Sequence, residues 1–348
     1  MIFILFYLGI LPEKSTGACA AIVDNRLYLF GGYVQYKGQT NRLSVMDLST
    51  FTWRDLSSEC SGQIPSPRDK LGCWVDGRKI IYFGGFGQPP ENMNKVNGDF
   101  SFESFPHAYE HGVGWNNQLY VYDSSSKKWS QPKSTGSVPC PRAAFATAQI
   151  HSQCFLFGGR YKDQRRNDLY VLDSKTFNWK QIEIVGKTPC GRSWHAMETI
   201  SNNHLFVYGG FDNTDHTLKD TWIFDIQENV WSELENSTKH LNIFAPRMWH
   251  TTSKTDSPGE VIIFGGCLDS IIGIDHSKHT NTVATFRFSP LSLKRQCLDF
   301  VMKNVGRYSN SVLNLPQSLQ RNIHHRSIAL GLKSPNGHGK LISNCEVM

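Results

Sequence analysis

The pair Gly-Gly, preceded each time by a hydrophobic run typical of a β-strand, occurs five times in this 348-residue chain. The copies are "LYLFGGY", "IIYFGGF", "CFLFGGR", "LFVYGGF" and "VIIFGGC", with their first glycines at 31, 84, 158, 209 and 265. A repeat of roughly 50 residues constrains the fold strongly, because one small sheet cannot bury both of its faces and must stack on copies of itself. Glycine at the turn permits a positive φ and a close backbone approach.

Each Gly-Gly pair begins a longer pattern. Four of the pairs are followed by a tryptophan that lies 21, 44, 20 and 21 residues after the second glycine, namely Trp53, Trp129, Trp179 and Trp231. An arginine then opens the next hydrophobic stretch, at Arg68, Arg142, Arg192 and Arg247. The pattern predicts units of four short strands, with the tryptophan wedged between neighbouring units.

The repeat resembles the kelch repeat, which implies an all-β fold, a kelch β-propeller over residues 12–290 with five recognisable blades. The kelch family expected here has six blades, so its first blade is the one without a Gly-Gly counterpart. The second interval is longer than the others, and its excess falls in Gly87–Gly114, rich in Pro, Gly and Asn. We interpret that segment as a long loop inserted within one blade.

The apolar start, residues 1–11, has two interpretations. It has the length of a signal-peptide core, but no basic segment precedes it and no small-residue cleavage site follows closely. It is too short to span a membrane. The favoured interpretation is a β-strand, either an N-terminal strand or the remnant of a truncated blade.

Composition narrows the class of function. A net charge of +6 without a long basic run does not favour a protein that coats nucleic acid. Nine scattered cysteines without C-x-x-C favour free thiols. No hydrolase, metalloprotease or phosphate-loop motif is present, so we expect no catalytic residue, metal or cofactor. His195 and His250 occupy equivalent repeat positions, which indicates a role in packing.

A cluster of cations follows the third Gly-Gly pair: Arg160, Lys162, Arg165 and Arg166. Arg160 stands where the other repeats carry an aromatic residue or a cysteine. Two guanidinium groups on one loop could converge on a carboxylate or phosphate, because their planar forks make paired, charge-assisted hydrogen bonds. The alternative is a pair of ordinary surface arginines, solvated or paired with Asp163 or Asp168.

The middle of the chain resembles the Kelch domain-containing protein 2 family in "PRDKLGCWV", "GWNN", "FGGRYKDQRRNDL", "GRSWH" and "RMWHT". Members of that family are substrate receptors of cullin-2 ubiquitin ligases and bind client C-termini that end in Gly-Gly. The resemblance implies a terminal carboxylate held by Arg160, Arg165 and Ser193. It also implies a pocket wall made by Trp194, Trp115, Phe86 and Lys70. Phe86 stands where close relatives carry tyrosine, and Val113 replaces a basic residue.

After residue 290 the pattern becomes helical, over residues 291–323, and then aperiodic over 324–348, which predicts a disordered tail. "SLKRQCLDFV" matches the elongin-C-binding box through Leu293, Cys297 and Val301. Leu315, Pro316 and Leu319 resemble a cullin-2 box. The alternative is a helix that packs on the last blade.

Three classes of function therefore stay open. The favoured one is a ligase substrate receptor in the nucleus and cytoplasm. Its expected partners are elongin B/C, cullin-2 and clients with Gly-Gly ends, and we expect it to bind neither nucleic acid nor membrane. The second is a kelch scaffold that binds actin or transcription factors. The third is an enzyme that uses the propeller funnel, such as a sugar isomerase or an oxidase.

Overall fold

The computed structural model describes residues 8–93, 96–103, 112–234, 245–269, 278–290, 293–303, 314–317 and 319–320. The chain forms two compact units, Met1–Phe288 and Ser289–Met348. Within the described residues, every helix is too short or too polar to cross a lipid bilayer. The predicted tail, residues 324–348, lies outside the described residues.

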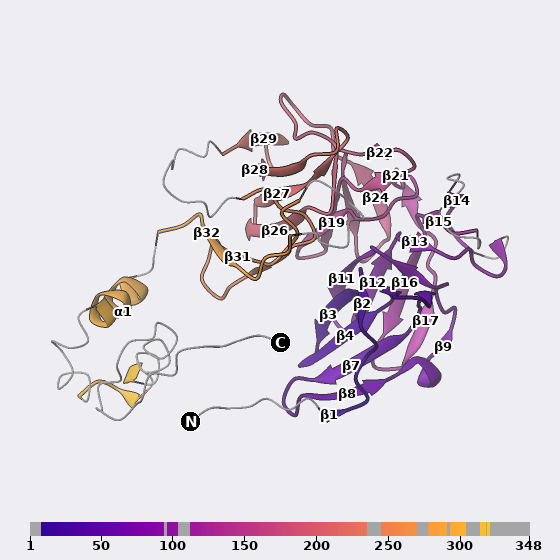
Figure 1. The fold of residues 1–348 in the computed structure, drawn as a ribbon, viewed down its shortest axis with the longest axis horizontal. Helices are drawn as coiled ribbons and strands as arrows, with labels where there is room; N and C mark the ends of the chain where they lie inside the picture. Colours follow the sequence, from indigo (N-terminus) through magenta and orange to yellow (C-terminus); the bar gives the residue numbers. More distant parts are fainter. Residues whose placement is uncertain are drawn as a thin grey trace. The chain divides into compact units, whose positions relative to one another are not determined.

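The first unit consists of antiparallel sheets whose strands follow the order of the chain (Figure 1). The innermost strands are β3 (Cys19–Val23), β11 (Gly72–Asp76), β19 (Ala146–Ile150), β26 (Ala196–Ser201) and β30 (Thr251–Lys254). Their hairpin partners are β4 (Arg26–Phe30), β12 (Lys79–Phe83), β20 (Gln153–Phe157), β27 (His204–Asp212) and β31 (Glu260–Phe264). Each inner strand packs beside the next, so the sheets stand around a common axis.

The outer part of each sheet follows the same order. Third come β7 (Leu43–Asp47), β16 (Leu119–Asp123), β23 (Leu169–Asp173), β28 (Thr217–Asp225) and β32 (Val283–Arg287). Fourth come β8 (Thr52–Asp55), β17 (Lys128–Ser130), β24 (Asn178–Gln181) and β29 (Val230–Glu233). These five sheets confirm the predicted kelch-type β-propeller.

Three blades gain a short parallel strand at the outer edge. β1 (Leu8–Gly9) pairs with β8, β9 (Ser61–Gly62) with β17, and β18 (Thr135–Gly136) with β24. In each case the segment that leads into a blade first runs along the outside of that same blade. The described part of the apolar start is therefore a strand, and it belongs to the first of the five sheets. The 3₁₀ turn Ser57–Glu59 lies between β8 and β9.

Small ribbons follow the Gly-Gly turns. The first ribbon contains β2 (Ser15–Thr16), β5 (Tyr33–Val34) and β6 (Gly38–Gln39), and the second contains β10 (Arg68–Asp69), β13 (Phe86–Gly87), β14 (Phe100–Phe102) and β15 (Gly114–Asn116). The third is the hairpin of β21 (Arg160–Tyr161) and β22 (Gln164–Arg165). In the fourth blade, β25 (Arg192–Ser193) pairs with the end of β27. The insertion at 87–114 is thus not a loop throughout. Phe100–Phe102 pairs with β15, because an extended segment beside an exposed edge satisfies its backbone groups there.

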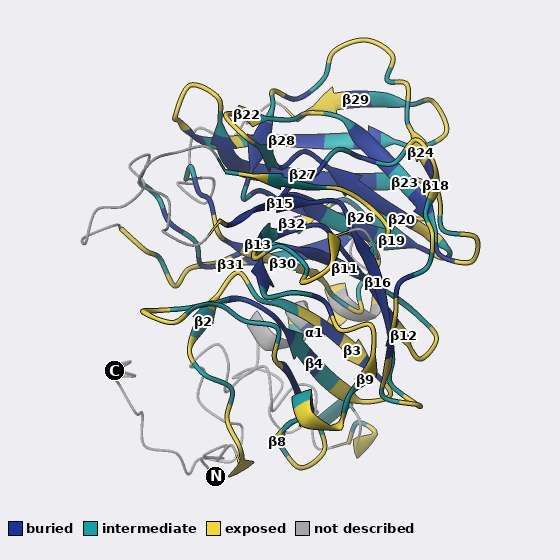
Figure 2. Ribbon diagram, turned by 90° about the vertical axis from the view of Figure 1, so that its right-hand side faces the viewer, coloured by how far each residue is buried: buried dark blue, intermediate teal, exposed yellow. Residues whose placement is uncertain are grey.

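The core lies between blades. Trp129 and Trp179 are fully buried, Trp231 is nearly so, and Trp53 is only half-buried. The Trp129 ring contacts Phe30, Tyr82 and Tyr122, with centroids 4.9–5.4 Å apart. Figure 2 shows the resulting distribution, with buried strands at the interior of the stacked sheets and exposed residues at their turns. Trp129, Trp179 and Trp231 therefore pack as the sequence predicts, whereas Trp53 is covered only in part.

Backbone hydrogen bonds link each blade to the next. The second glycine of a pair donates its N–H to the carbonyl of the following repeat arginine: Gly32 to Arg68, Gly85 to Arg142, Gly159 to Arg192 and Gly210 to Arg247, at 2.8–2.9 Å. Both glycines of every pair have positive φ. A Cβ on Gly159 would lie 2.8 Å from Phe145 Cβ and 2.9 Å from Ala143 O. The turn requires glycine for both reasons.

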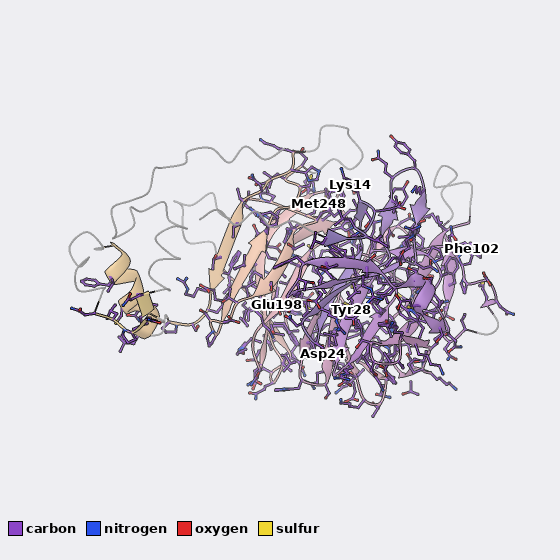
Figure 3. The ribbon with its side chains drawn as sticks, turned by 90° about the horizontal axis from the view of Figure 1, so that it is seen from below. Lys14, Asp24, Tyr28, Phe102, Glu198 and Met248 are labelled. Carbon is purple, nitrogen blue, oxygen red and sulfur yellow. The ribbon has the colours of Figure 1, made fainter. Side chains whose placement is uncertain are left out.

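A second series of backbone bonds also runs from blade to blade. Lys70 N–H donates to Gly17 O, Ala144 N–H to Lys70 O, Trp194 N–H to Ala144 O and Trp249 N–H to Trp194 O, at 2.7–3.1 Å. All five residues have positive φ, although four are not glycine. In Figure 3, Lys14 and Met248, close to the two ends of this series, lie toward one edge of the propeller, and Asp24 lies toward the other.

The second unit contains α1 (Leu293–Lys303). Leu298 is buried, and Val301, Leu315 and Leu319 pack against it. The carbonyl of Pro316 accepts hydrogen bonds from Leu319 N–H (2.9 Å) and Gln320 N–H (3.1 Å), as in a helical turn. Helix α1 agrees with the helical spacing predicted from residue 291 onward.

Candidate functional site

The basic cluster lies on a two-stranded hairpin. β21 and β22 pair so that Arg160 is directly opposite Arg165, and Tyr161 is opposite Gln164. Residues opposite each other in an antiparallel pair project from the same face. The register therefore puts both arginines on one face of the hairpin. Lys162 lies at the exposed tip, with a positive φ.

Arg165 is held in place by its neighbours. Its side chain is only 8% exposed. Nε donates a hydrogen bond to Ser193 Oγ (3.2 Å), and the guanidinium carbon lies 4.6 Å from the centre of the Phe211 ring. The backbone N–H of Arg165 donates to Asn213 Oδ1 (2.7 Å). These contacts fix the guanidinium and leave it limited freedom to turn away.

The charge of Arg165 is poorly compensated. Burial, and then the positive charge of Arg160, lower the pKa of Arg165. The nearest carboxylate is Asp215 Oδ1, 3.7 Å from Arg165 Nη1, on a side chain that is 78% exposed. So exposed a carboxylate at that distance compensates little of the arginine charge. Two like charges are thus held together where an anion would stabilise both.

Arg160 makes a different set of contacts. Its Nε donates to the carbonyl of Lys162 (2.7 Å), and its guanidinium carbon lies 6.0 Å from the Trp115 ring. Among the described residues, no carboxylate lies within ion-pair distance of Arg160. Of the alternatives from the sequence, pairing with Asp163 or Asp168 therefore does not apply to Arg160, and Asp168 binds Arg142 instead, at 2.6 and 2.9 Å. A solvated arginine stays the alternative for Arg160.

The aromatic residues form two groups. Phe86 and Trp115 make an edge contact (centroids 5.2 Å apart), and Trp115 contacts Tyr161 of the hairpin (6.0 Å). Trp194 contacts Phe211 and Trp249, at 5.9 and 5.5 Å. Trp115 is buried, whereas Phe86 and Trp194 are half-buried. The first group lies beside Arg160, and the second lies beside Arg165.

Lys70 and Ser193 each have a partner already. Lys70 Nζ pairs with Asp69 Oδ2 (2.5 Å) and lies 5.9 Å from the Phe86 ring. Asp69 is buried, and burial raises its pKa. Ser193 is fully buried, and its hydroxyl accepts the Arg165 hydrogen bond. In this structure Ser193 therefore positions Arg165.

The surroundings of Arg165 include residues that the sequence analysis did not assign to the site: Phe211 and Asn213 contact Arg165, and Trp249 contacts Trp194. Phe211 follows a Gly-Gly pair, as Arg160 and Phe86 do, so the repeat register was the signal available for it. Asn213 comes from another turn, and no local pattern pointed to it. Trp249 occupies the repeat position of Trp194, two residues after the arginine.

The repeat histidines pack as expected. His195 and His250 are buried, with rings 5.3 Å from Phe157 and 5.4 Å from Tyr208. Burial lowers the pKa of both, that of His250 to about 3, so both are neutral at pH 7. The described residues contain no group of three or more acidic, histidine or cysteine side chains that could hold a metal ion.

The residues of the two C-terminal motifs lie in the second unit. Leu293 and Cys297 are exposed on α1, Leu293 by 76%. Val301 is half-buried against Leu298, together with Leu315 and Leu319. Pro316 begins the helical turn that contains Leu319. The three elongin-box positions recur at every fourth residue of a formed helix.

Comparison with known proteins agrees with the fold. A family profile described as the KLHDC2/KLHL20/DRC7 Kelch-repeats domain matches residues 7–102 and 109–293. Kelch domain-containing protein 2 of Homo sapiens is 44% identical over 323 residues, which cover 91% of this chain and 77% of that protein. The Bos taurus protein of that name is 40% identical over 323 residues, with the same coverage.

A further relative is Kelch domain-containing protein 1 of Mus musculus, 36% identical over 323 residues, which cover 90% of this chain and 77% of that protein. The match therefore includes the Gly-Gly repeats, the β21–β22 hairpin and the arginine positions of the blades. The chain belongs to the kelch-repeat family of Kelch domain-containing protein 2.

Proposed function

We propose that this protein is the substrate-recognition subunit of a cullin-2–elongin B/C ubiquitin ligase, and that it binds client C-termini ending in Gly-Gly. The observation that carries the proposal is the Arg160–Arg165 pair. The two residues are opposite each other on one hairpin, Arg165 is almost buried, and neither has a close, buried carboxylate among the described residues. A chain terminus supplies the missing anion in a form that both forks can grip.

Selection for glycine follows from the aromatic groups. Phe86 and Trp115 lie on the Arg160 side, and Trp194 and Phe211 lie on the Arg165 side. Side chains this large, next to a fixed carboxylate, restrict the room for a Cβ on the last residues of the bound chain. Specificity then comes from exclusion of larger residues as well as from the ionic contact.

The hairpin offers a matched test. Arg160→Ala and Arg165→Ala are each expected to weaken binding of a peptide ending in Gly-Gly by at least tenfold, about 1.4 kcal/mol. Lys162→Asn removes the same charge from the exposed tip of the same hairpin and is expected to change affinity by less than about threefold. Equal losses in all three variants would indicate general charge attraction, and the carboxylate site would be wrong.

The ligase role is tested separately on α1. Leu293 and Cys297 are exposed, so their replacement does not remove packing inside the second unit. We expect Leu293→Ala with Cys297→Ala to abolish co-purification with elongin C. Phe300→Ala, which changes a residue of the same helix that is 58% exposed but outside the motif, is the control. Retention of elongin C by the double variant would favour the kelch scaffold instead.

A further inference from the structure

Two cysteine thiols meet at the interface between the first and second blades. Cys19 lies on β3, and Cys73 lies on β11, the inner strand of the next blade. The Cys73 thiol donates a hydrogen bond to the carbonyl of Ala20 (Sγ–O 3.4 Å), the residue after Cys19. Cys19 and Cys73 both pack against the same core between these blades. The two thiols therefore face one site, although they belong to different blades.

The surroundings of this pair leave it accessible. Both residues are half-buried at the edge of the core that contains Tyr28, Phe30 and Tyr82, and both are free thiols. The contact with the Cys73 thiol, followed by burial, raises the pKa of the Cys19 thiol. Cys19 is therefore a protonated thiol at neutral pH.

We propose that Cys19 and Cys73 form an oxidisable dithiol site, which a peroxide converts into a disulfide between the first two blades. The Cys73 sulfur attacks one peroxide oxygen and becomes a sulfenic acid as the first water leaves. The Cys19 sulfur then attacks the sulfenic sulfur, the S–S bond forms, and the second water leaves. Each thiol loses one hydrogen atom, and the two electrons reduce the peroxide.

Geometry favours this pair over the other cysteines. A disulfide requires Cβ atoms about 3.5–4.5 Å apart, so thiols not already in contact need backbone movement before they can be bridged. Of the described cysteines, Cys60 packs at the same core but at the outer edge of the blades, beside Tyr122 and Trp129. Cys19 and Cys73, in contrast, lie on neighbouring inner strands, and the Cys73 thiol already reaches the residue that follows Cys19.

The bond would reinforce a link that exists in the reduced protein. Lys70 N–H donates to Gly17 O (2.7 Å), and these residues precede Cys73 and Cys19 by only a few positions. Among the described sheets, the first blade packs through its inner strand on the second blade alone. A disulfide makes this contact covalent and removes conformations from the unfolded chain.

The test uses the full chain, fully reduced and then treated with hydrogen peroxide. Digestion with trypsin after alkylation is expected to yield peptide 15–26 joined to peptide 71–78, since these hold Cys19 and Cys73. Cys73→Ser is expected to abolish this product, whereas Cys60→Ser is expected to leave it intact. The oxidised wild type is expected to unfold about 5 °C above the reduced protein.

Three outcomes would overturn the proposal. One is equal alkylation of Cys19 and Cys73 before and after peroxide, and another is a disulfide that joins other cysteines instead. The third is a protein in which the Cys19–Cys73 disulfide forms but the unfolding midpoint equals that of Cys73→Ser treated with peroxide. That result would contradict the predicted stabilisation of the contact between the first two blades. All three readouts are independent of peptide or elongin binding.

Discussion

At the scale of single residues, the buried arginines of the repeat show how charge is used inside the blades. Arg192 is fully buried and is bound by both carboxylate oxygens of Asp220, at 2.9 and 2.7 Å. Arg142 and Asp168 repeat this arrangement one blade earlier. Arg68 instead donates to Asn116 and Gln118 amide oxygens, at 2.7 and 2.9 Å. Each guanidinium thus ties an inner turn to its own blade.

Asp220→Asn is expected to lower the free energy of unfolding by about 3 kcal/mol at pH 7, because it leaves the Arg192 charge buried without its partner. Burial opposes ionisation of Asp220, but the Arg192 hydrogen bond and charge outweigh it and lower its pKa. The contribution is therefore present above the ordinary pKa of 3.8 and is lost as pH falls through the folded value. Urea unfolding at pH 7 and pH 3 measures this, with exposed Asp163→Asn as the control.

His250 should make the protein sensitive to mild acid. Its folded pKa is about 3 and its ordinary pKa is 6.5, so below pH 6.5 the unfolded chain takes up a proton that the folded chain does not. Stability then falls as pH falls, by at most about 1.4 kcal/mol per pH unit. We expect His250→Gln to lose less stability than the wild type between pH 7 and 4.5. His151→Gln changes an exposed histidine and should lose as much stability as the wild type. If the wild type and both variants lose the same free energy of unfolding between pH 7 and 4.5, His250 is not the cause.

At the scale of secondary structure, the Gly-Gly turn decides how blades join. Gly159 and Gly186 have similar positive φ values, 92° and 81°, but only Gly159 has atoms within 3 Å of where a Cβ would be. Alanine at either position carries the left-handed backbone cost of roughly 1–2 kcal/mol. Gly159→Ala should cost about 1–3 kcal/mol more than Gly186→Ala, because the turn and the segment with Ala143 and Phe145, in the same blade, must move apart. Chemical denaturation of both variants compares them, and equal losses would show that packing at the turn is unimportant.

The elements also show how far sequence reasoning reached. The five Gly-Gly pairs predicted the number of blades, the hairpins of their inner strands and the β21–β22 hairpin, because each of these depends on local spacing. The parallel strand Leu8–Gly9 and the strand Phe100–Phe102 depend on an edge supplied by a distant part of the chain. The same holds for the site: Arg160 and Arg165 were visible in one hairpin, whereas Asn213 reaches Arg165 from a different blade. Such contacts carry no local pattern.

At the scale of the whole first unit, the blades differ in how well they are covered. β20 and β27 are buried along most of their length. In the first and last sheets, large apolar side chains are exposed: Ile22 by 59%, Phe264 by 52% and Val283 by 63%. In the first four pairs, the N–H of the second glycine donates to the carbonyl of the next repeat arginine. Among the described residues, no repeat arginine follows Gly266, the second glycine of the last pair, to accept such a bond.

Local stability should follow this difference. Amide hydrogen exchange is expected to be slowest in β20 and β27 and faster in β3 and β32, because amides open more readily where few apolar contacts cover the sheet. Mass-spectrometric exchange on the reduced full chain measures this. Uniform protection across all five sheets would mean that the first and last sheets are covered as well as the middle ones in solution.

The proposal that the Arg160–Arg165 pair holds a chain terminus is best tested by a change to that terminus alone. A peptide ending in Gly-Gly is titrated into the protein as the free acid and as the C-terminal amide. We expect the amide to bind at least tenfold more weakly, a loss of about 1.4 kcal/mol or more, because it lacks the negative charge that the two arginines bind. Equal affinity for the two peptides would contradict it.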